Sequence, residues 1–157
     1  MDTGSKKQLQ RCPNCGHSPL RDEVVADRFE YRPEGEEAIV VEAQNVPVQV
    51  CPNCGEKYLG PTAVRAQHAA VCQALGLLTP DEIQAIRERI GPTQAEFARL
   101  TGIGEATISR WERGRILPNR AMDRYLRLLD RNFANVTLLK SLAPSPGDAA
   151  AGPVEPR

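Results

Sequence analysis

Four of the five cysteines in this chain lie in two copies of one pentapeptide, Cys12–Gly16 and Cys51–Gly55, each reading Cys-Pro-Asn-Cys-Gly. Each copy holds two thiols two residues apart on a tight turn, and this spacing lets both sulfurs reach one metal ion. A closed tetrahedral shell of thiolates is predicted from Cys12, Cys15, Cys51 and Cys54. Such a shell has no open position, so it indicates a structural Zn²⁺ rather than a catalytic one. Four-sulfur sites also accept iron, and the pattern leaves that choice open.

Paired cysteines also serve as structural disulfides or as redox centres. Disulfides belong mainly to secreted proteins, and Met1–Gln10 does not resemble a secretory signal peptide, so we expect a cytoplasmic protein with reduced thiols. A thioredoxin-like enzyme would carry one Cys-x-x-Cys motif at the start of a helix in a βαβ pattern, whereas both motifs here lead into loops. No paired carboxylates, phosphate loop or nucleophile–base pair supports other catalysis. An enzyme is therefore the weakest of the function classes.

A second pattern lies in Thr93–Gly114, where two short helical segments flank a turn that contains glycine. Gly102 allows this turn to take a positive φ. The second segment places Ile108 and Trp111 three residues apart, so both side chains face the same, inward side of a helix. This arrangement is typical of a helix-turn-helix, a motif that binds DNA.

With its apolar side turned inward, the second helix has an opposite face that can enter a DNA major groove. Arg110 can bond guanine O6 and N7, and Glu105 can accept a hydrogen bond from cytosine N4. Thr93 would cap the first helix, and Gln94 beside it could reach a phosphate. The DNA-contacting residues predicted from the pattern are Thr93, Gln94, Glu105, Ala106, Ser109, Arg110, Arg113 and Arg115. The two arginines after the helix would contact backbone phosphates and make binding depend on salt.

The chain between the two cysteine motifs should form the β-structure that positions them. Strand-like stretches occur at Val24–Tyr31, Ala38–Glu42 and Val46–Val50, with Asn45 as a break between the last two. A small antiparallel meander held at its ends by the metal is the simplest arrangement. Pro47 would then have to lie at an edge or at the start of a strand.

After the second cysteine motif the pattern becomes helical. Pro61–Leu75 is rich in alanine and is expected to form a connecting helix that Gly76 ends. Thr79 followed by Pro80 is a strong helix start. Five further helices are expected at Thr79–Ile90, Thr93–Leu100, Gly104–Arg113, Asn119–Asp130 and Asn132–Leu142. The predicted fold class is α+β, with a small zinc-bound β domain, a connecting helix and an all-α domain of five helices.

This pattern divides the chain into five segments. They are a disordered tail at 1–10, a zinc-binding domain at 11–60, a linker helix at 61–78, a helix-turn-helix domain at 79–142 and a disordered tail at 143–157. The last segment contains four prolines and two glycines, a composition that does not favour a packed structure.

A formal net charge of zero hides a difference between the two halves of the chain. Arg11–Gly60 contains five Lys/Arg and nine Asp/Glu, a net charge of −4, and Zn²⁺ with four thiolates would add −2. Thr79–Lys140 contains eleven Lys/Arg and eight Asp/Glu, a net charge of +3. This difference favours two modules with different partners. No apolar run approaches the roughly 18 residues that span a membrane, so no membrane partner is expected.

His68 and Cys72 lie one helical turn apart on the predicted connecting helix and could share a metal ion. Neither has a further ligand nearby in the sequence. We therefore expect Cys72 to be a small buried apolar residue and His68 an ordinary exposed side chain.

The last two expected helices carry more apolar residues than the core of a five-helix domain needs. These residues are Tyr125, Leu126, Leu128, Leu129, Phe133, Val136, Leu138 and Leu139. Core packing explains at least half of them, and the remainder favour a homodimer. A two-fold pair would place two recognition helices one DNA turn apart on a palindromic site.

The segment Thr93–Gly114, continued by Ile116–Leu129, resembles the helix-turn-helix of the XRE/Cro-repressor family. The two Cys-Pro-x-Cys-Gly motifs with short strands between them resemble the YgiT-type zinc finger. The two modules in this order resemble MqsA-family antitoxins of bacterial type II toxin–antitoxin systems, and the resemblance covers about Arg11–Lys140.

That resemblance implies a zinc-stabilised N-terminal domain that binds a small ribonuclease-like toxin, and a C-terminal domain that dimerises and represses its own operon. The family's base-contacting arginine falls on Arg110. Its base-contacting asparagine falls on Ala106, which cannot contact adenine in that way, so the operator should differ and the adjacent contacts are expected to shift to Glu105 or Thr107. The alternative hypothesis is a free-standing zinc-containing regulator of the XRE family with no toxin partner.

Overall fold

The computed structural model describes residues 9–142, so most of the predicted tail 1–10 and all of the tail 143–157 lie outside the described residues. The chain forms two compact units. The first, which we call the knuckle unit, runs to Pro80 and also includes Arg113–Leu117. The second, the helical unit, comprises Asp81–Glu112 and continues from Pro118.

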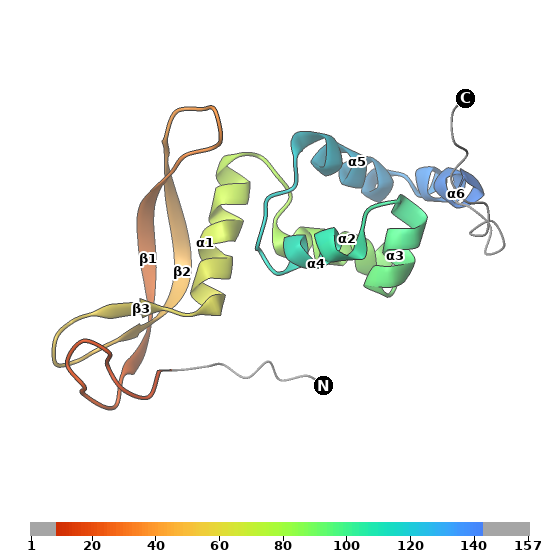
Figure 1. Cartoon of the computed structure of the whole chain (residues 1–157). Coiled ribbons are helices and arrows are strands. Elements are labelled where there is room, and N and C mark those ends of the chain that lie inside the picture. The colour runs from red at the N-terminus through yellow and green to blue at the C-terminus, as the bar shows by residue number, and fades with distance from the viewer. Residues whose placement is uncertain (1–8, 143–157) are drawn as a thin grey trace, which may run out of the picture. The chain divides into compact units, whose positions relative to one another are not determined.

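A three-stranded antiparallel sheet with the order β1-β2-β3 forms one side of the knuckle unit (Figure 1). Its strands are β1 at Arg21–Tyr31, β2 at Ile39–Val50 and β3 at Lys57–Leu59. The prediction of two separate strands around Asn45 is wrong, because β2 is continuous through it. Asn45 takes a positive φ of 56°, and the register with β1 shifts at this point, so Gln44 and Asn45 form a bulge.

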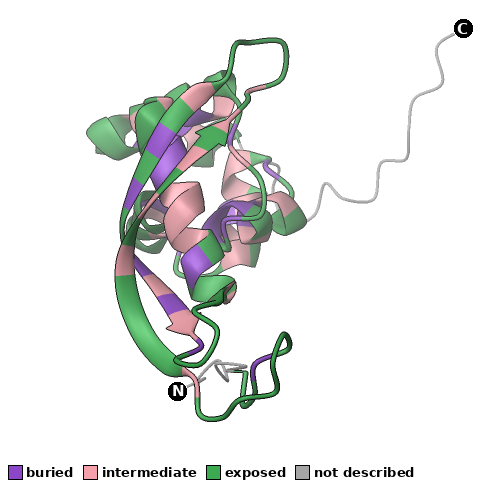
Figure 2. Cartoon of the chain, turned by 90° about the vertical axis from the view of Figure 1, so that its left-hand side faces the viewer, coloured by how far each residue is buried: buried purple, intermediate pink, exposed green. Residues whose placement is uncertain are grey.

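The bulge keeps one face of β2 apolar along its whole length. Before it, Val41 and Ala43 face the core, and after it Val46 and Val48 do so. The core-facing positions are odd-numbered before the bulge and even-numbered after it. In a regular strand, odd and even positions face opposite sides of the sheet. Gln44 and Asn45 together oppose one residue of β1, and this one extra residue restores the alternation; Figure 2 shows buried and exposed residues alternating along the strands.

Pro47 lies inside β2, which is the central strand of the sheet. On one side it pairs with Val24 of β1, while the register with β3 begins only at Val48. At Pro47 the strand therefore has a neighbour on one side alone, which is the edge-like environment that a proline needs.

The core of the knuckle unit forms between β2 and α1, which spans Pro61–Ala74. Its buried residues are Val41, Ala43, Val46, Val48, Ala63, Ala70 and Val71. Leu117, from the separate segment of this unit, packs against the same cluster. Gly76 takes a φ of +67° just after α1 and allows the chain to leave the helix, as predicted.

Within the residues that the structure describes, five helices follow α1, and their bounds lie within one residue of those predicted. They are α2 at Pro80–Ile90, α3 at Gln94–Thr101, α4 at Glu105–Glu112, α5 at Arg120–Arg131 and α6 at Phe133–Leu142 (Figure 1). Within the helical unit, α3 contacts α4 and α6, and α5 contacts α6. The predicted α+β fold class is confirmed. In the described residues, no helix combines the length and apolarity needed to cross a membrane.

Large side chains fill the interior of the helical unit. Its buried hydrophobic residues are Ile83, Ile86, Phe97, Ile103, Ile108, Trp111, Leu126, Leu129 and Val136. Phe97, Ile108 and Leu126 have no exposed surface. The inward orientation predicted for Ile108 and Trp111 is thus confirmed.

Candidate metal centre and nucleic-acid interface

The four cysteines of the two pentapeptides converge at one place in the knuckle unit. All four sulfur atoms lie within 4.8 Å of one another. Two pairs join the two motifs, with Cys12 Sγ 3.6 Å from Cys54 Sγ and Cys15 Sγ 3.5 Å from Cys51 Sγ. A tetrahedral Zn²⁺ with Zn–S bonds near 2.3 Å would hold its sulfurs about 3.8 Å apart. The observed spacing therefore fits one such ion.

Both pentapeptides adopt the same backbone conformation. The amide of Gly16 donates to the carbonyl of Cys12 at 2.8 Å, and that of Gly55 donates to the carbonyl of Cys51 at 2.9 Å. Gly16 and Gly55 have φ values of 74° and 73°, which residues with a side chain rarely adopt. The first cysteine of each pair is buried and the second is exposed, so the cluster lies at the edge of the unit.

Side chains outside the cysteines also contact the sulfurs. The hydroxyl of Tyr58, on β3, lies 3.1 Å from Cys12 Sγ, and the side-chain amide of Asn53 donates to Cys15 Sγ at 3.5 Å. Burial raises the pKa of Cys12, but the hydrogen bond with Tyr58 and bonds with the backbone of Cys15 and Asn14 outweigh it, and the pKa falls to about 6. The bond from Asn53 lowers the pKa of Cys15.

The last thiol of the cluster behaves in the opposite way. A bond with the backbone of Glu56 lowers the pKa of Cys54, but burial and hydrogen bonds with the other three cysteines raise it to about 11. Without a metal ion, the cluster thus holds a proton on Cys54 at neutral pH. A divalent cation replaces such shared protons, so its binding should release protons and weaken as pH falls.

The helix-turn-helix occupies α3, the turn at Gly102–Gly104 and α4. The Thr93 hydroxyl accepts from the Glu96 amide at 3.1 Å, and the Glu96 carboxylate accepts from the Thr93 amide at 3.1 Å, which forms a complete capping box. Gly102 ends α3 in the left-handed region with a φ of 73°. From α5, the Tyr125 hydroxyl donates to the Thr101 carbonyl at 3.3 Å and braces the turn.

One face of α4 is open to solvent and the other is buried. Glu105, Ala106 and Arg110 are exposed, whereas Thr107 and Ser109 are half-buried. Of the other predicted contacts, Thr93, Arg113 and Arg115 are exposed and Gln94 is half-buried. The exposed face of α4 thus carries the side chains expected to reach base edges.

A buried charge at the end of α4 is absent from the sequence-based predictions. Glu112 has a side chain that is 8% exposed, and it accepts from Arg87 Nε of α2 at 2.5 Å. Gln94, the first residue of α3, donates to the same carboxylate at 2.7 Å. This network joins α2, α3 and the end of α4.

The two arginines after α4 belong to the knuckle unit rather than to the helical unit. Between them, Gly114 takes a φ of +63°, and a Cβ at this position would lie 3.4 Å from the ring of His68. His68, on α1, is also hydrogen-bonded to the backbone of Ile116. The prediction of an ordinary exposed His68 is wrong, because this side chain is half-buried and holds the segment. Cys72 is fully buried, as predicted.

The apolar residues of α5 and α6 divide into a buried and an exposed set. Leu126, Leu129 and Val136 are buried in the core. The large hydrophobic side chains left exposed are Leu128 at 59%, Phe133 at 66%, Leu138 at 61% and Leu142 at 71%. Of the eight apolar residues predicted here, three are buried, three are exposed, and Tyr125 and Leu139 are half-buried. The exposed set, with Leu142, forms what we call the apolar surface of α5 and α6.

Comparisons with known proteins agree with the presence of both the cysteine motifs and the helix-turn-helix. Over 55 residues the chain is 38% identical to the protein named antitoxin HigA-2 of Vibrio cholerae. Those residues are 35% of this chain and 53% of HigA-2, so the chain spans about half the length of that relative. Residues 10–140 match the family described as the antitoxin component of bacterial toxin–antitoxin systems, MqsA. These residues include both cysteine motifs and the complete helix-turn-helix, and the family is not one of enzymes. The chain belongs to the MqsA antitoxin family.

Proposed function

We propose that this protein neutralises a small protein toxin through its knuckle unit and represses its own operon as a DNA-binding dimer. The observation that carries this proposal is the joint presence, in one chain of an antitoxin family, of a closed four-sulfur cluster and a helix-turn-helix with an exposed reading face. The division into a zinc-binding domain at 11–60, a linker helix at 61–78 and a DNA-binding domain at 79–142 is part of the proposal.

For the metal, we propose Zn²⁺ bound by Cys12, Cys15, Cys51 and Cys54. The donor set supports it, since Zn²⁺ accepts four thiolates in tetrahedral geometry and the sulfurs have the required spacing. With four protein ligands no position is left for substrate, so the ion would hold the two pentapeptides together and do no chemistry.

For DNA, we propose that α4 lies in the major groove and that Arg110 contacts a guanine. Arg110 is exposed on the face opposite the buried Ile108 and Trp111. Glu105 and Thr107 would contact neighbouring bases, and Ala106 can offer only an apolar contact, for example with a thymine methyl group. Thr93 and the backbone of Gln94 would contact the phosphates near the start of α3, with Ser109 beside the bases.

For assembly, we propose a homodimer formed through the apolar surface of α5 and α6. Exposed leucine and phenylalanine side chains on adjacent helices favour burial against a second copy. Leu138→Glu should convert the dimer to a monomer in sedimentation or light-scattering measurements and weaken binding to a palindromic site. An equally polar change at the exposed Ser141 serves as the control.

For the toxin, the knuckle unit offers an acidic surface with exposed apolar side chains. Its region 11–60 carries a net charge of −4, and Val24 and Val40 are 67% and 53% exposed. Such a surface suits a basic partner. The neighbouring gene in the operon should therefore encode a small basic protein.

The first test is an affinity pull-down of the tagged protein from its native host, with mass spectrometry of small proteins that co-purify. We expect a stoichiometric partner that is lost with Cys51→Ser and kept with Cys72→Ala, which removes a buried thiol outside the cluster. A protein without a partner that still shifts its own upstream DNA would contradict the antitoxin proposal and leave a free-standing regulator.

A further inference from the structure

The two cysteine motifs leave the sheet of the knuckle unit at one end. β1 begins at Arg21, which pairs with Val50, the last residue of β2. β3 begins at Lys57, which pairs with the same Val50. The first motif precedes Arg21, and the second fills the loop between Val50 and Lys57. All three strands therefore have an end at Val50, directly before Cys51 of the four-sulfur cluster.

Tyr58, the middle residue of β3, connects this strand to the first cysteine motif. Its hydroxyl lies 3.1 Å from Cys12 Sγ, 46 positions away in the sequence. A metal-bound thiolate has no proton and can only accept, so the Tyr58 hydroxyl would donate to this sulfur when the ion is bound. Hydrogen bonds to charged acceptors are roughly twice as strong as those between neutral groups. Tyr58 is half-buried, which limits the competition from water for the same sulfur.

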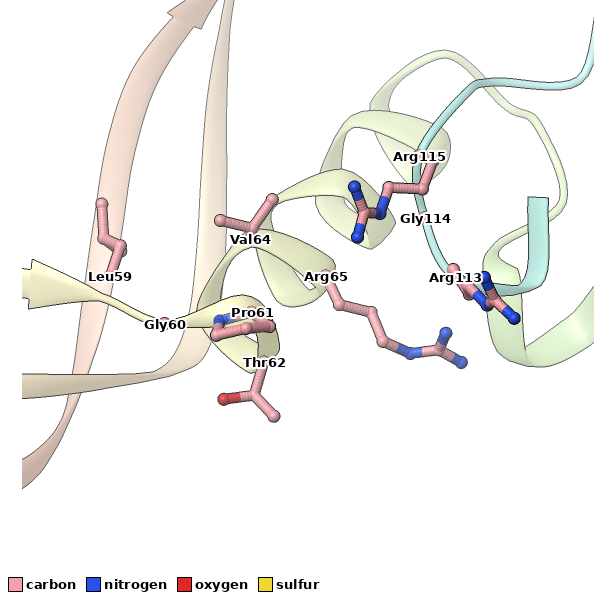
Figure 3. Close-up of a pocket in the computed structure, with 9 residues that line it drawn as sticks. All are labelled: Leu59, Gly60, Pro61, Thr62, Val64, Arg65, Arg113, Gly114 and Arg115. Carbon is pink, nitrogen blue, oxygen red and sulfur yellow. The ribbon is translucent and has the colours of Figure 1, made fainter. Parts of the chain in front are cut away.

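The strand that carries Tyr58 is short and leads directly into the helix that packs on the sheet. β3 has three residues, and its last residue, Leu59, is followed by Gly60 and then by Pro61, the first residue of α1 (Figure 3). β3 contacts both β2 and α1. A bond from Tyr58 to the cluster would therefore fix this strand where the chain enters the core of the unit.

The two pentapeptides have the same sequence, but their asparagines make different contacts. The side-chain amide of Asn53 donates to Cys15 Sγ of the other motif at 3.5 Å. In the described part of the chain, no matching bond joins the Asn14 side chain to Cys54 Sγ. Both sulfurs of the first motif thus have a side-chain donor from outside the cysteines, Tyr58 for one and Asn53 for the other.

These donors suit the charge that a metal centre would have here. Four thiolates with one Zn²⁺ carry a net charge of −2. The region 11–60 around them already carries a net charge of −4. Donors outside the ligands orient the ligands and tune the metal, and their loss typically reduces metal affinity about 10–100-fold. A hydroxyl on a paired strand and an amide on the facing loop would withdraw charge from the sulfurs of the first motif.

We propose that Tyr58 and Asn53 are positioning residues of the metal centre, which donate hydrogen bonds to the metal-bound sulfurs of Cys12 and Cys15 and increase the affinity for the ion. This inference rests on the proposed Zn²⁺ site and adds to it two residues outside the four ligands. Tyr58 makes the larger contribution, because its bond is shorter and its side chain is half-buried, whereas Asn53 is exposed.

The test measures metal binding by the full-length Tyr58→Phe variant, which keeps the ring and removes only the hydroxyl. Zinc affinity, measured by competition with a chromophoric chelator, should fall about 10–100-fold. Co²⁺ in place of Zn²⁺ gives a second readout, because its thiolate charge-transfer band moves to longer wavelength when a sulfur loses a hydrogen bond. The d–d bands of Co²⁺, which report tetrahedral geometry, should stay unchanged. The matched control is Tyr31→Phe, which changes a half-buried tyrosine at the opposite end of β1 and should behave like wild type.

A second matched pair consists of Asn53→Ala and Asn14→Ala, which make the same change in the two pentapeptides. Both side chains are exposed, so neither change removes a side chain from the core, and the pair tests the proposal even where Tyr58→Phe fails to fold. Asn53→Ala should lower zinc affinity and shift the charge-transfer band by less than Tyr58→Phe does, and Asn14→Ala should match wild type. Equal behaviour of the two asparagine variants would remove Asn53 from the proposal.

Three results would overturn the role of Tyr58. Wild-type affinity and spectrum in Tyr58→Phe would show that the hydroxyl does not bond to a metal-bound sulfur. Reduced affinity with an unchanged charge-transfer band would make Tyr58 a structural part of β3 only. Both results leave the proposed metal site intact, whereas failure of the wild type to bind Co²⁺ through thiolates would overturn that site as well. Thermal melting checks that each variant is folded.

Discussion

The two units of this protein are stabilised in different ways. The buried core of the knuckle unit between β2 and α1 consists of valine and alanine, whereas the helical unit buries phenylalanine, tryptophan, isoleucine and leucine. Burial of larger side chains removes more apolar surface from water and contributes more to folding. We therefore expect the knuckle unit to depend on its four-sulfur cluster and the helical unit to fold on its own core. This difference would allow a four-cysteine cluster and a helix-turn-helix to be combined in a short chain.

Removal of the metal is expected to have the largest effect on stability. Chelation of zinc should abolish the thermal unfolding transition of the knuckle unit and leave that of the helical unit in place, because only the first contains the cluster. Calorimetry with and without chelator measures both transitions. Cys51→Ser should act like the chelator, and Cys72→Ala should keep one zinc per chain. Equal loss of both transitions would show that the helical unit also depends on the metal.

The next effect concerns the buried ion pair of the helical unit. Arg87→Met leaves the Glu112 carboxylate buried without its charged partner, and we expect a loss of about 3–5 kcal/mol in the free energy of unfolding. The matched control is Arg89→Met, which breaks the exposed pair with Asp130 and should cost about 0–1 kcal/mol. Urea unfolding measures both. Similar losses in the two variants would mean that the buried pair contributes no more than a surface pair.

A smaller effect separates DNA reading from folding. Arg110→Ala should reduce the preference for operator over scrambled DNA by about 1–3 kcal/mol, since one guanine contact is lost. Its side chain is exposed, so the free energy of unfolding should not change. Arg113→Gln is the comparison, because it should weaken both duplexes equally. If Arg110→Ala also weakened both equally, α4 would not be reading bases.

The smallest effect tests the segment held by His68. Gly114→Ala forces a left-handed conformation on a residue with a side chain, at a cost of about 1–2 kcal/mol. Gly35→Ala carries the same penalty at a φ of +75° but meets nothing within 4 Å. A larger loss of unfolding free energy in Gly114→Ala than in Gly35→Ala measures the contact with His68. Equal losses would show that His68 moves aside.

Local signals made the helices of this protein predictable. Caps and turns such as Thr93, Gly102 and Asn119 act within a few residues, so the bounds of α3 and α5 follow from the sequence. Family membership likewise follows from the two cysteine motifs combined with the helix-turn-helix. The bases that the protein contacts and the partners that it binds remain predictions.

The features that sequence reasoning missed depend on contacts between distant residues. Asn45 is a turn former locally, but pairing with β1 across the sheet makes it part of a bulge. The three-residue β3 exists because Val48–Val50 pairs with it. The burial of Glu112 depends on Arg87, which lies 25 positions away in the sequence. His68 likewise depends on Gly114, far along the chain.

The segment Arg113–Leu117 belongs to the knuckle unit although it follows α4 in the sequence. This affects how the protein can be cut into fragments and how its two units can be recombined. Neither unit is a continuous stretch of chain, because the knuckle unit takes this segment from within the helical part of the sequence. A fragment cut after Pro80 loses Leu117 from its core, and the complementary fragment carries that side chain away from its partners. Recombination that joined this front to another helix-turn-helix domain would have to bring a compatible segment after the helix that corresponds to α4. The two halves should therefore be inherited together.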